Sequence, residues 1–321
     1  MAARRVSLVT GGAGFVGYNL CKRLLQQGDE VICLDDMTSG MPQHVDELQR
    51  YEHCHFLRHD VCEPVTLKVD RIFNLACPAS PPAYQADPIK TVLTSVLGVR
   101  NMLELALAND ARVLHTSTSE IYGDPLEHPQ RESYNGNVKT MGPRACYDEG
   151  KRCAETLLHD YHRVRGADVR VVRIFNTYGP GMRADDGRAV SNFVVQALAG
   201  KDLTVYGDGS YTRSFCYVDD LIDGILLLME LDGDHAQPVN LGNPHEIAIN
   251  ELAELVLAAT GSRSRIVHLA NAVDDPKVRC PDITRATALL GWRPKVDIAD
   301  GLRPTVDYFR RVQTGAVDAG A

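Results

Sequence analysis

A glycine-rich turn near the amino terminus limits the possible folds of this chain more than any other feature. Residues 9–17 read VTGGAGFVG and lie between a strand-like run and a helical pattern. Glycine alone allows both a tight turn and a close approach of the backbone to a pyrophosphate, and the following helix offers free amides and the positive end of its dipole. The turn therefore predicts a dinucleotide site, with cofactor contacts at Gly11, Gly14, Phe15, Val16 and Gly17.

An acidic residue at the end of the next strand-like run indicates which dinucleotide binds. Asp35 stands about eighteen residues after Gly17, where a carboxylate can accept hydrogen bonds from the ribose hydroxyls of NAD. Asp36 adds negative charge that repels the extra phosphate of NADP. The sequence therefore predicts NAD as cofactor. Asp60 and Val61 follow another strand and are expected either to bracket the adenine or to form an ordinary strand-end turn.

Strand-like runs and helical patterns alternate through the first half of the chain. The expected strands are 6–10, 31–34, 55–57, 71–76, 112–116 and 169–174, and the expected helices are 19–27, 91–107 and 147–163. This alternation is typical of a parallel sheet covered by helices on both faces. The sequence predicts an α/β fold, with a Rossmann-type doubly wound parallel sheet and a smaller C-terminal substrate-binding α/β lobe.

The pattern becomes less regular after residue 178, which suggests a division into two parts. We expect residues 1–178 to form the NAD-binding domain, with about 214–240 returning to it. Residues 179–213 and 241–313 are expected to form a smaller substrate-binding lobe, and 314–321 a disordered tail. Within the lobe, Asn250 is predicted to cap a helix that ends before Gly261.

Composition argues against several other classes of protein. The net charge of −8 disfavours a nucleic-acid-binding surface. No apolar stretch approaches the ~20 residues that span a bilayer, so no membrane association is expected. The nine cysteines include no CxxC pair, which disfavours disulfides and a metal site and favours a reducing cytoplasm.

Two segments carry residues suited to proton transfer. Tyr147 and Lys151 are four residues apart in a helical pattern, so they share one face, and a lysine cation lowers the pKa of a nearby phenol. A tyrosine so activated can take a hydroxyl proton while hydride leaves for nicotinamide. Thr118 and Glu120 follow a predicted strand, where ligands of a parallel sheet bind; Thr118 is a candidate donor and Glu120 a candidate acid–base group.

These motifs together resemble the extended short-chain dehydrogenase/reductase family over nearly the whole chain. Within that family, the longest matching segments resemble the UDP-glucuronate decarboxylase branch, which makes UDP-xylose. These segments read CPASPPAYQADPIKT, STSEIYGDPLEHPQ, GPRACYDEGKRCAET, RIFNTYGP, DDGRAVSNF, LTVYGDGSYTRSFCYVDDL and VNLGNP.

The resemblance implies a catalytic cycle and a set of substrate contacts. Tyr147 would be the base, Lys151 its electrostatic partner and Thr118 a hydroxyl donor. Oxidation at carbon 4 of UDP-glucuronate would give a 4-ketone that loses carbon dioxide, and the hydride would then return. Substrate contacts are expected at Asn176, Arg188, Ser191, Asn192, Tyr206, Arg213 and Arg279, together with Glu120.

Related reactions remain alternatives at this level. Ser119 occupies the place where 4,6-dehydratases have an aspartate, which disfavours dehydration, and a 4-epimerase or a UDP-apiose/xylose synthase is closer. Leu93 and Ser95 depart from the decarboxylase pattern, in which lysine and asparagine are expected. A non-catalytic NAD-binding module is the alternative from another class, although Tyr147 and Lys151 are both present.

The sequence also predicts self-association. Helices 91–107 and 147–163 carry more apolar surface than one face of a sheet needs. We expect a homodimer in which these helices form a four-helix bundle, with Leu103, Leu107, Leu157 and Leu158 at the interface.

Overall fold

A seven-stranded parallel sheet forms the centre of the molecule. The structure is a computed structural model and describes residues 4–270 and 278–314. The strand order is β11-β6-β5-β4-β1-β2-β3, and every neighbouring pair is parallel. The strands are β1 Val6–Thr10, β2 Glu30–Asp35, β3 Cys54–Arg58, β4 Arg71–Asn74, β5 Arg112–Thr118, β6 Val169–Ile174 and β11 Val239–Leu241. This architecture confirms the predicted α/β fold with a Rossmann-type sheet.

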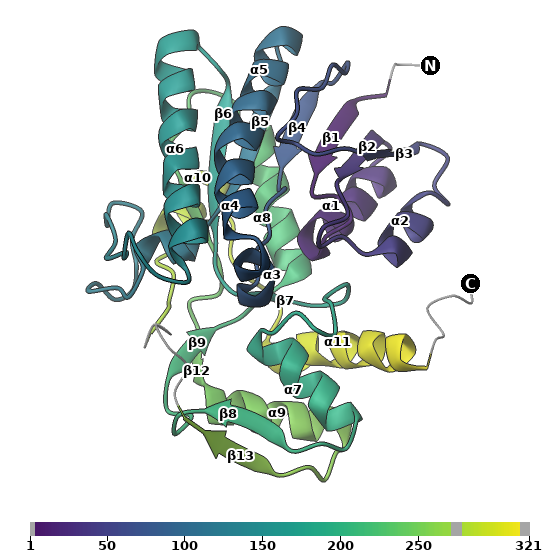
Figure 1. The fold of residues 1–321 in the computed structure, drawn as a ribbon, viewed down its shortest axis with the longest axis vertical. Coiled ribbons are helices and arrows are strands. Elements are labelled where there is room, and N and C mark those ends of the chain that lie inside the picture. Colours follow the sequence, from purple (N-terminus) through teal and green to yellow (C-terminus); the bar gives the residue numbers. More distant parts are fainter. Residues whose placement is uncertain (1–3, 271–277, 315–321) are drawn as a thin grey trace.

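Helices cover both faces of the sheet because its strands are buried on both sides. On one face, α4 (Pro88–Leu93), α5 (Val99–Asn109) and α6 (Ala145–Arg165) lie side by side (Figure 1). On the other face α1 (Phe15–Gln26) packs against α8 (Val218–Glu230), and α2 (Pro42–Leu48) packs against α1. Leu8, Phe73, Leu114 and Val172 are fully buried between these layers.

The helix expected at 91–107 is longer and less regular than predicted. It runs as α4, a π-helical segment at Thr94–Gly98 and α5, and it begins where Asp87 accepts a hydrogen bond from the Lys90 amide at 2.9 Å. A side chain at position 98 would come within 2.7 Å of Val61, so glycine permits this close approach. Together, Pro88–Asn109 is long and apolar enough to cross a membrane by length and composition, and half of it is buried inside the fold. The sequence prediction that no stretch reaches such a length was therefore wrong.

A smaller lobe packs below the carboxyl ends of the strands (Figure 1). Its helices are α7 Ala189–Leu198, α9 Ile249–Thr260 and α11 Ile298–Gln313, whereas α10 Thr284–Leu290 packs against β11 and α8 beside the sheet. Its strands form the pairs β8 (Leu203–Tyr206) with β13 (Ile266–Leu269) and β9 (Thr212–Ser214) with β12 (Glu246–Ala248). A further pair, β7 (Thr177–Tyr178) with β10 (Cys216–Tyr217), lies between the sheet and the lobe.

One predicted helix start in the lobe was wrong. The residue that caps α9 is Ala248, and Asn250 lies inside the first turn. The Asn250 amide instead donates to the Asp208 carbonyl at 2.9 Å, so this side chain serves the preceding turn rather than the helix end. Gly261 closes the helix with a positive φ, as predicted. The division of the chain into domains stays a prediction, and its tail lies outside the described residues apart from Thr314.

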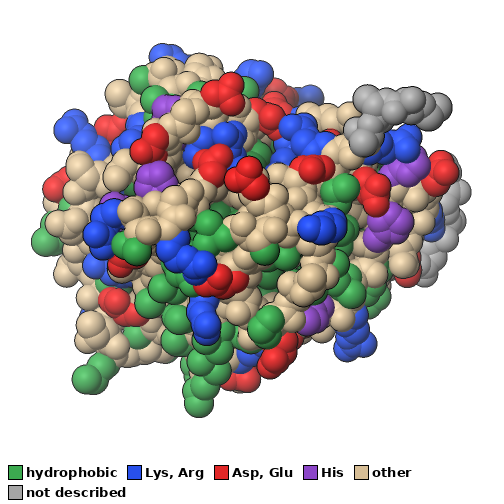
Figure 2. All heavy atoms as spheres, turned by 90° about the horizontal axis from the view of Figure 1, so that it is seen from above, with side chains coloured by type: hydrophobic (Ala, Val, Ile, Leu, Met, Phe, Trp, Pro, Cys, Tyr) green, Lys and Arg blue, Asp and Glu red, His purple; other side chains and the backbone are tan. Residues whose placement is uncertain are grey.

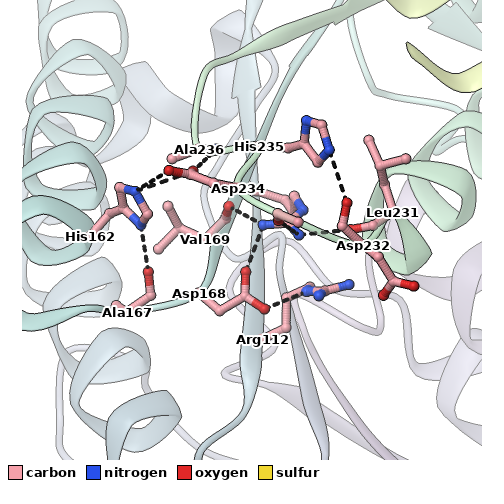
Figure 3. A network of polar contacts seen from close by, with 12 residues as sticks. Arg112, His162, Ala167, Asp168, Val169, Leu231, Asp232, Asp234, His235 and Ala236 are labelled. Carbon is pink, nitrogen blue, oxygen red and sulfur yellow. Dashed lines mark hydrogen bonds and ion pairs between the residues drawn. The ribbon is translucent and has the colours of Figure 1, made fainter.

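The amino ends of the central strands are held by a polar network (Figure 3). The buried Arg170 guanidinium donates to the carbonyls of Leu231 and Gly233 at 2.7 and 2.8 Å and pairs with Asp168 at 2.6 Å. Arg112 donates to the other oxygen of Asp168 at 2.7 Å. These contacts join β5 and β6 to the segment that follows α8, so they fix the end of the sheet that lies away from the lobe.

Candidate active site

A cavity of about 850 Å³ lies at the carboxyl ends of the strands, between the sheet and the lobe. This is where ligands bind in open parallel sheets. Most residues predicted to bind cofactor or substrate line it. These are Gly11, Gly14, Phe15, Val16, Gly17, Asp35, Val61, Thr118, Glu120, Tyr147, Lys151, Asn176, Arg188, Asn192, Tyr206, Arg213 and Arg279.

The glycine loop has the close packing that its sequence predicts. Gly11 has φ +68°, and a side chain there would come within 3.0 Å of the backbone of Ala76. At Gly17 an added Cβ would stand 2.1 Å from the Gly11 carbonyl oxygen. The loop therefore needs glycine at both positions to pass directly from β1 into α1. The amino end of α1 then faces the cavity, where a pyrophosphate fits.

Of the two acidic residues predicted to contact the cofactor, only Asp35 lines the cavity. Its carboxylate accepts hydrogen bonds from the amides of Ala13 at 3.0 Å and Met37 at 2.9 Å, which fix it at the end of β2. Asp60 does not line the cavity. It pairs with Lys90 and accepts a hydrogen bond from the Cys62 amide at 2.9 Å, so its charge is already compensated. Lys90 itself lines the cavity in its place.

Tyr147 and Lys151 project from the first turns of α6 toward β5. The Lys151 ammonium donates to the Thr116 carbonyl at 2.7 Å and lies 6.0 Å from the centre of the Tyr147 ring. The ring of Tyr84 stacks on that of Tyr147 with centroids 5.1 Å apart. These contacts hold the phenol in one orientation at the carboxyl end of β5, beside Thr118.

The protonation of this pair differs from the sequence prediction. Burial, and the nearby Cys77 thiol, raise the pKa of Tyr147 well above its usual range, although a hydrogen bond with Thr118 lowers it. Burial also lowers the pKa of Lys151. Desolvation is thus the largest influence on both groups, and it disfavours the charged form of each. Lys151 alone therefore does not make Tyr147 acidic.

Glu120 lies between two arginines. Arg144, at the start of α6, and Arg279, from the lobe, each donate to one of its carboxylate oxygens. Burial raises the pKa of Glu120, but the charges of Arg279 and Arg144 prevail and lower it to about 2. Glu120 is therefore ionised at neutral pH. The Nη2 atom of Arg279 is buried and has no hydrogen-bond partner among the described residues, so it can donate a hydrogen bond to an oxygen of a ligand.

The predicted substrate contacts come mainly from the lobe. Arg188 is held by Asp186 through two hydrogen bonds, one of them 2.7 Å long. Arg213 is positioned by β9, which pairs with β12, and its Nη1 atom donates to the Thr212 carbonyl at 2.9 Å. Ser191 does not line the cavity. Its side chain is fully buried on the core side of α7, where it donates to the Arg188 carbonyl at 2.9 Å.

Leu93 and Ser95, the two residues that depart from the decarboxylase pattern, differ in how close they lie to the cavity. Leu93 is 42% exposed on α4 and does not line the cavity, so a lysine at this position is not needed to form its walls. Ser95 is buried, and its hydroxyl lies 3.4 Å from the Cys77 thiol, which itself lines the cavity. Ser95 therefore contacts a wall of the site, whereas Leu93 does not.

Three residues of the site carry no clear signal in the sequence. Arg144 and Tyr84 hold Glu120 and Tyr147, and Asp148 is buried beside them with one oxygen lacking a partner among the described residues. Burial, then the charge of Glu120, raises the pKa of Asp148 to about 7. Tyr84 comes from α3 (Pro81–Ala86), whereas Arg144 and Asp148 come from the start of α6, so these side chains meet only in the fold. Their types alone do not distinguish them from surface residues.

Comparison with known proteins agrees with this geometry. The model of the NAD dependent epimerase/dehydratase family matches residues 7–242. The chain belongs to this family. Membership of the NAD dependent epimerase/dehydratase family confirms both the predicted resemblance and NAD as the cofactor.

Individual members of the epimerase/dehydratase family are similar over most of the chain. UDP-glucuronic acid decarboxylase 1 of Arabidopsis thaliana is 53% identical over 303 residues, which cover 94% of this chain and 69% of the relative. UDP-glucuronic acid decarboxylase 1 of Danio rerio is 51% identical over 308 residues, covering 96% and 73%. The solved structure of UDP-glucuronic acid 4-epimerase from Bacillus cereus, in complex with UDP-glucuronic acid and NAD, is 27% identical with a TM-score of 0.85, covering 96% and 99%.

Proposed function

We propose that this protein is a UDP-glucuronate decarboxylase, which converts UDP-glucuronate to UDP-xylose with NAD as cofactor. The observation that carries the proposal is the meeting of Tyr147, Thr118 and the Glu120 cluster in one cavity with the glycine loop. Identity of about half to the named decarboxylases over nearly the whole chain supports the same reaction.

The first step is removal of a proton from the sugar. The Tyr147 oxygen takes the proton of the 4-hydroxyl, while Thr118, which is hydrogen-bonded to Tyr147, orients that hydroxyl. NAD, which the glycine loop and Asp35 would hold in this cavity, would supply a reversible hydride acceptor for carbon 4. Only the phenolate of Tyr147 can take this proton, and burial disfavours it, so the Thr118 hydrogen bond and the nearby charge of Arg188 must help to stabilise that phenolate before the transfer.

The second step follows from the position of the new ketone. A 4-ketone is β to the carboxylate at carbon 5, so the carbon–carboxylate bond breaks with its electron pair moving into an enolate, and carbon dioxide leaves. Carbon 5 then takes a proton from solvent, Tyr147 returns its proton to the 4-oxygen, and carbon 4 takes back the hydride, which gives the pentose. No hydroxide is expelled, so Ser119 need not be an acid, and the ionised Glu120 has no proton to donate.

The buried charges fit an anionic substrate. Arg279 and Arg144 lie at the cavity wall with Glu120 as their partner, and Arg188 and Arg213 extend the positive charge along the lobe. A guanidinium can form two parallel hydrogen bonds to a carboxylate or a phosphate. We assign Arg279 and Arg144 to the sugar end together with Arg188, whose charge acts on Tyr147 and Glu120. Arg213 is then left for the diphosphate end of the ligand.

The test is incubation of the purified protein with UDP-glucuronate and NAD, followed by mass spectrometry of the nucleotides. The expected product is UDP-xylose with release of carbon dioxide. UDP-galacturonate would instead identify a 4-epimerase, and a branched-sugar product a UDP-apiose/xylose synthase. NAD binding with no product from any UDP-sugar would identify a binding module.

We also propose that the protein is a homodimer formed by a four-helix bundle. The residues predicted at the interface need correction, since Leu103 and Leu158 are fully buried against the sheet and Leu107 and Leu157 are partly buried. The exposed apolar side chains nearby are those of Ile89, Val92 and Leu93 on α4, and they form a flank that a second copy can cover.

Light scattering tests the dimer, and the double variant Ile89→Glu, Val92→Glu should give a monomer. A monodisperse wild-type monomer at micromolar concentration would contradict the dimer.

We also propose a cytoplasmic location, and only the free cysteines support it. Fractionation of the source cells tests this location.

A further inference from the structure

Three side chains with different donor atoms meet on the lobe side of the cavity. His128 comes from the loop after β5, Glu246 from the start of β12 and Cys280 from the segment before α10. One nitrogen, oxygen or sulfur atom of each lies within 4.8 Å of the others. The sequence does not predict such a site, because the three residues are far apart along the chain and no ligand spacing marks them.

The positions of these donors suit a tetrahedral metal ion. His128 Nε2 lies 2.9 Å from Glu246 Oε2. Bonds of about 2.0 to 2.3 Å at tetrahedral angles place zinc ligands about 3.3 to 3.8 Å apart. Small rotations of the three side chains therefore suffice to surround one ion. We propose that His128, Glu246 and Cys280 form a Zn²⁺ site, with water as the fourth ligand.

The surroundings of each donor support a built site. The Thr212 hydroxyl donates to Glu246 Oε1 at 2.7 Å, so the other carboxylate oxygen is directed toward His128. The backbone of Cys280 is fixed by two hydrogen bonds of 2.9 Å with Gln130, one to its amide and one to its carbonyl. The Cys280 side chain is buried and His128 is partly exposed, which gives the ion a path from solvent.

The charges also balance at this position. A thiolate, a carboxylate and a neutral imidazole together carry two negative charges, which neutralise one Zn²⁺ ion. Mixed nitrogen, oxygen and sulfur donors favour zinc over magnesium or calcium, which prefer oxygen alone. Binding requires the Cys280 proton to leave, so one proton is released for each ion bound.

The proposed site is next to two arginines that line the cavity. Cys280 directly follows Arg279, and Glu246 lies on β12, which pairs with the strand that carries Arg213. An ion at this point ties the loop after β5 to both arginine-bearing segments. Metal binding should therefore raise the melting temperature of the lobe, whichever reaction the cavity catalyses.

Cobalt titration of the full-length, chelator-treated protein tests the site. Co²⁺ bound to a thiolate gives a charge-transfer absorption band in the near ultraviolet. We expect this band to saturate at one equivalent and to disappear when Zn²⁺ is added. It should be absent in Cys280→Ser and His128→Ala and unchanged in the control Cys153→Ser, because Cys153 is exposed on α6.

A variant with a smaller expected effect on metal affinity provides a second test. Thr212→Val removes the hydrogen bond that orients Glu246 and should lower the affinity for Co²⁺ about tenfold, as loss of an outer partner does in other metal sites. If Cys280→Ser fails to fold, His128→Ala and Glu246→Gln decide the question. No saturating band in the wild type, or a band that survives in both folded variants, would overturn the proposal.

Discussion

The two ends of the central sheet both contain buried arginines, but they use them differently. At the amino ends, both terminal nitrogens of Arg170 donate to backbone carbonyls, and one of them also pairs with Asp168. Its one buried nitrogen without a partner among the described residues is Nε, at the inner end of the guanidinium. At the carboxyl ends, Arg279 contacts one oxygen of Glu120 and leaves a buried nitrogen without a partner among the described residues. One arginine is fixed by the backbone, and the other retains capacity to bind a ligand.

This difference separates stability from function. An arginine whose donors reach backbone carbonyls holds segments together, because its loss leaves those partly buried carbonyls without their donor. An arginine paired mainly with another side chain can be removed with less effect on the backbone. The outer surface does not show the distinction: the face drawn in Figure 2 mixes acidic and basic side chains.

The largest expected effect on catalysis comes from a substitution at the carboxyl ends of the strands. Tyr147→Phe removes the oxygen that takes the substrate proton, so kcat should fall about 10²- to 10⁴-fold. The melting temperature should stay close to that of the wild type, because the ring still stacks on Tyr84. Steady-state kinetics with UDP-glucuronate and a thermal melt measure both quantities.

The second prediction concerns the arginine with the free nitrogen. Arg279→Met should lower kcat/KM about 100-fold, the size seen when one buried donor to a developing charge is lost. Glu120 keeps Arg144 as a partner, so the protein should still fold. The matched control is Arg131→Met, whose side chain is 69% exposed and should leave kcat/KM unchanged.

The third prediction applies to the opposite end of the sheet. Arg170→Met should lower the free energy of unfolding by about 2 kcal/mol, since the partly buried carbonyls of Leu231 and Gly233 lose their donor. kcat/KM should be unchanged at temperatures where the variant is folded. Denaturant unfolding beside Arg163→Met, an exposed control, measures the loss. An Arg170→Met protein that is as stable as the wild type but inactive would contradict the contrast between the two ends of the sheet.

The fourth prediction uses pH. Burial raises the pKa of Asp148 to about 7, so between pH 4 and 7 the folded state holds a proton that the unfolded state releases. The contribution of this group to stability is therefore lost as pH rises through 7. Asp148→Asn should stabilise the protein at pH 8 by on the order of 1 to 2 kcal/mol, and much less at pH 4. An equal change at both pH values, measured by denaturant unfolding, would show that Asp148 does not titrate this way.

The smallest effect on catalysis is expected from a substitution that lies at neither end of the sheet. Leu93→Lys restores the residue expected from the decarboxylase pattern, but Leu93 is exposed and does not line the cavity. The KM for UDP-glucuronate should change by no more than about twofold, as for other surface substitutions. A much larger decrease in KM would show that position 93 reaches the sugar.

The sequence predicts the sheet more fully than the site. The glycine loop, the regular alternation of strands and the pair Tyr147 and Lys151 depend on local spacing, which a sequence displays directly. The partners of Glu120 could not be predicted in this way, because Arg144 and Arg279 come from segments that meet only in the folded chain. Asp60 and Ser191 do not line the cavity, and their partners Lys90 and the Arg188 carbonyl are likewise visible only in the structure.

The pKa of Tyr147 shows a second limit of sequence reasoning. Spacing places a lysine near the phenol, but the balance between desolvation and charge depends on how deeply both are buried. Only the structure supplies that depth. The strands of the lobe were missed as well, because they are short and pair with segments distant in the chain.

The most direct test of the central claim uses UDP-glucuronate that carries deuterium at carbon 4. If the sugar is oxidised there and the same hydride is returned within one active site, the UDP-xylose formed should retain the deuterium at carbon 4. Mass spectrometry and NMR of the product measure its position. UDP-xylose that has lost the label, or labelled UDP-glucuronate that stays unchanged in the presence of NAD, would contradict the account.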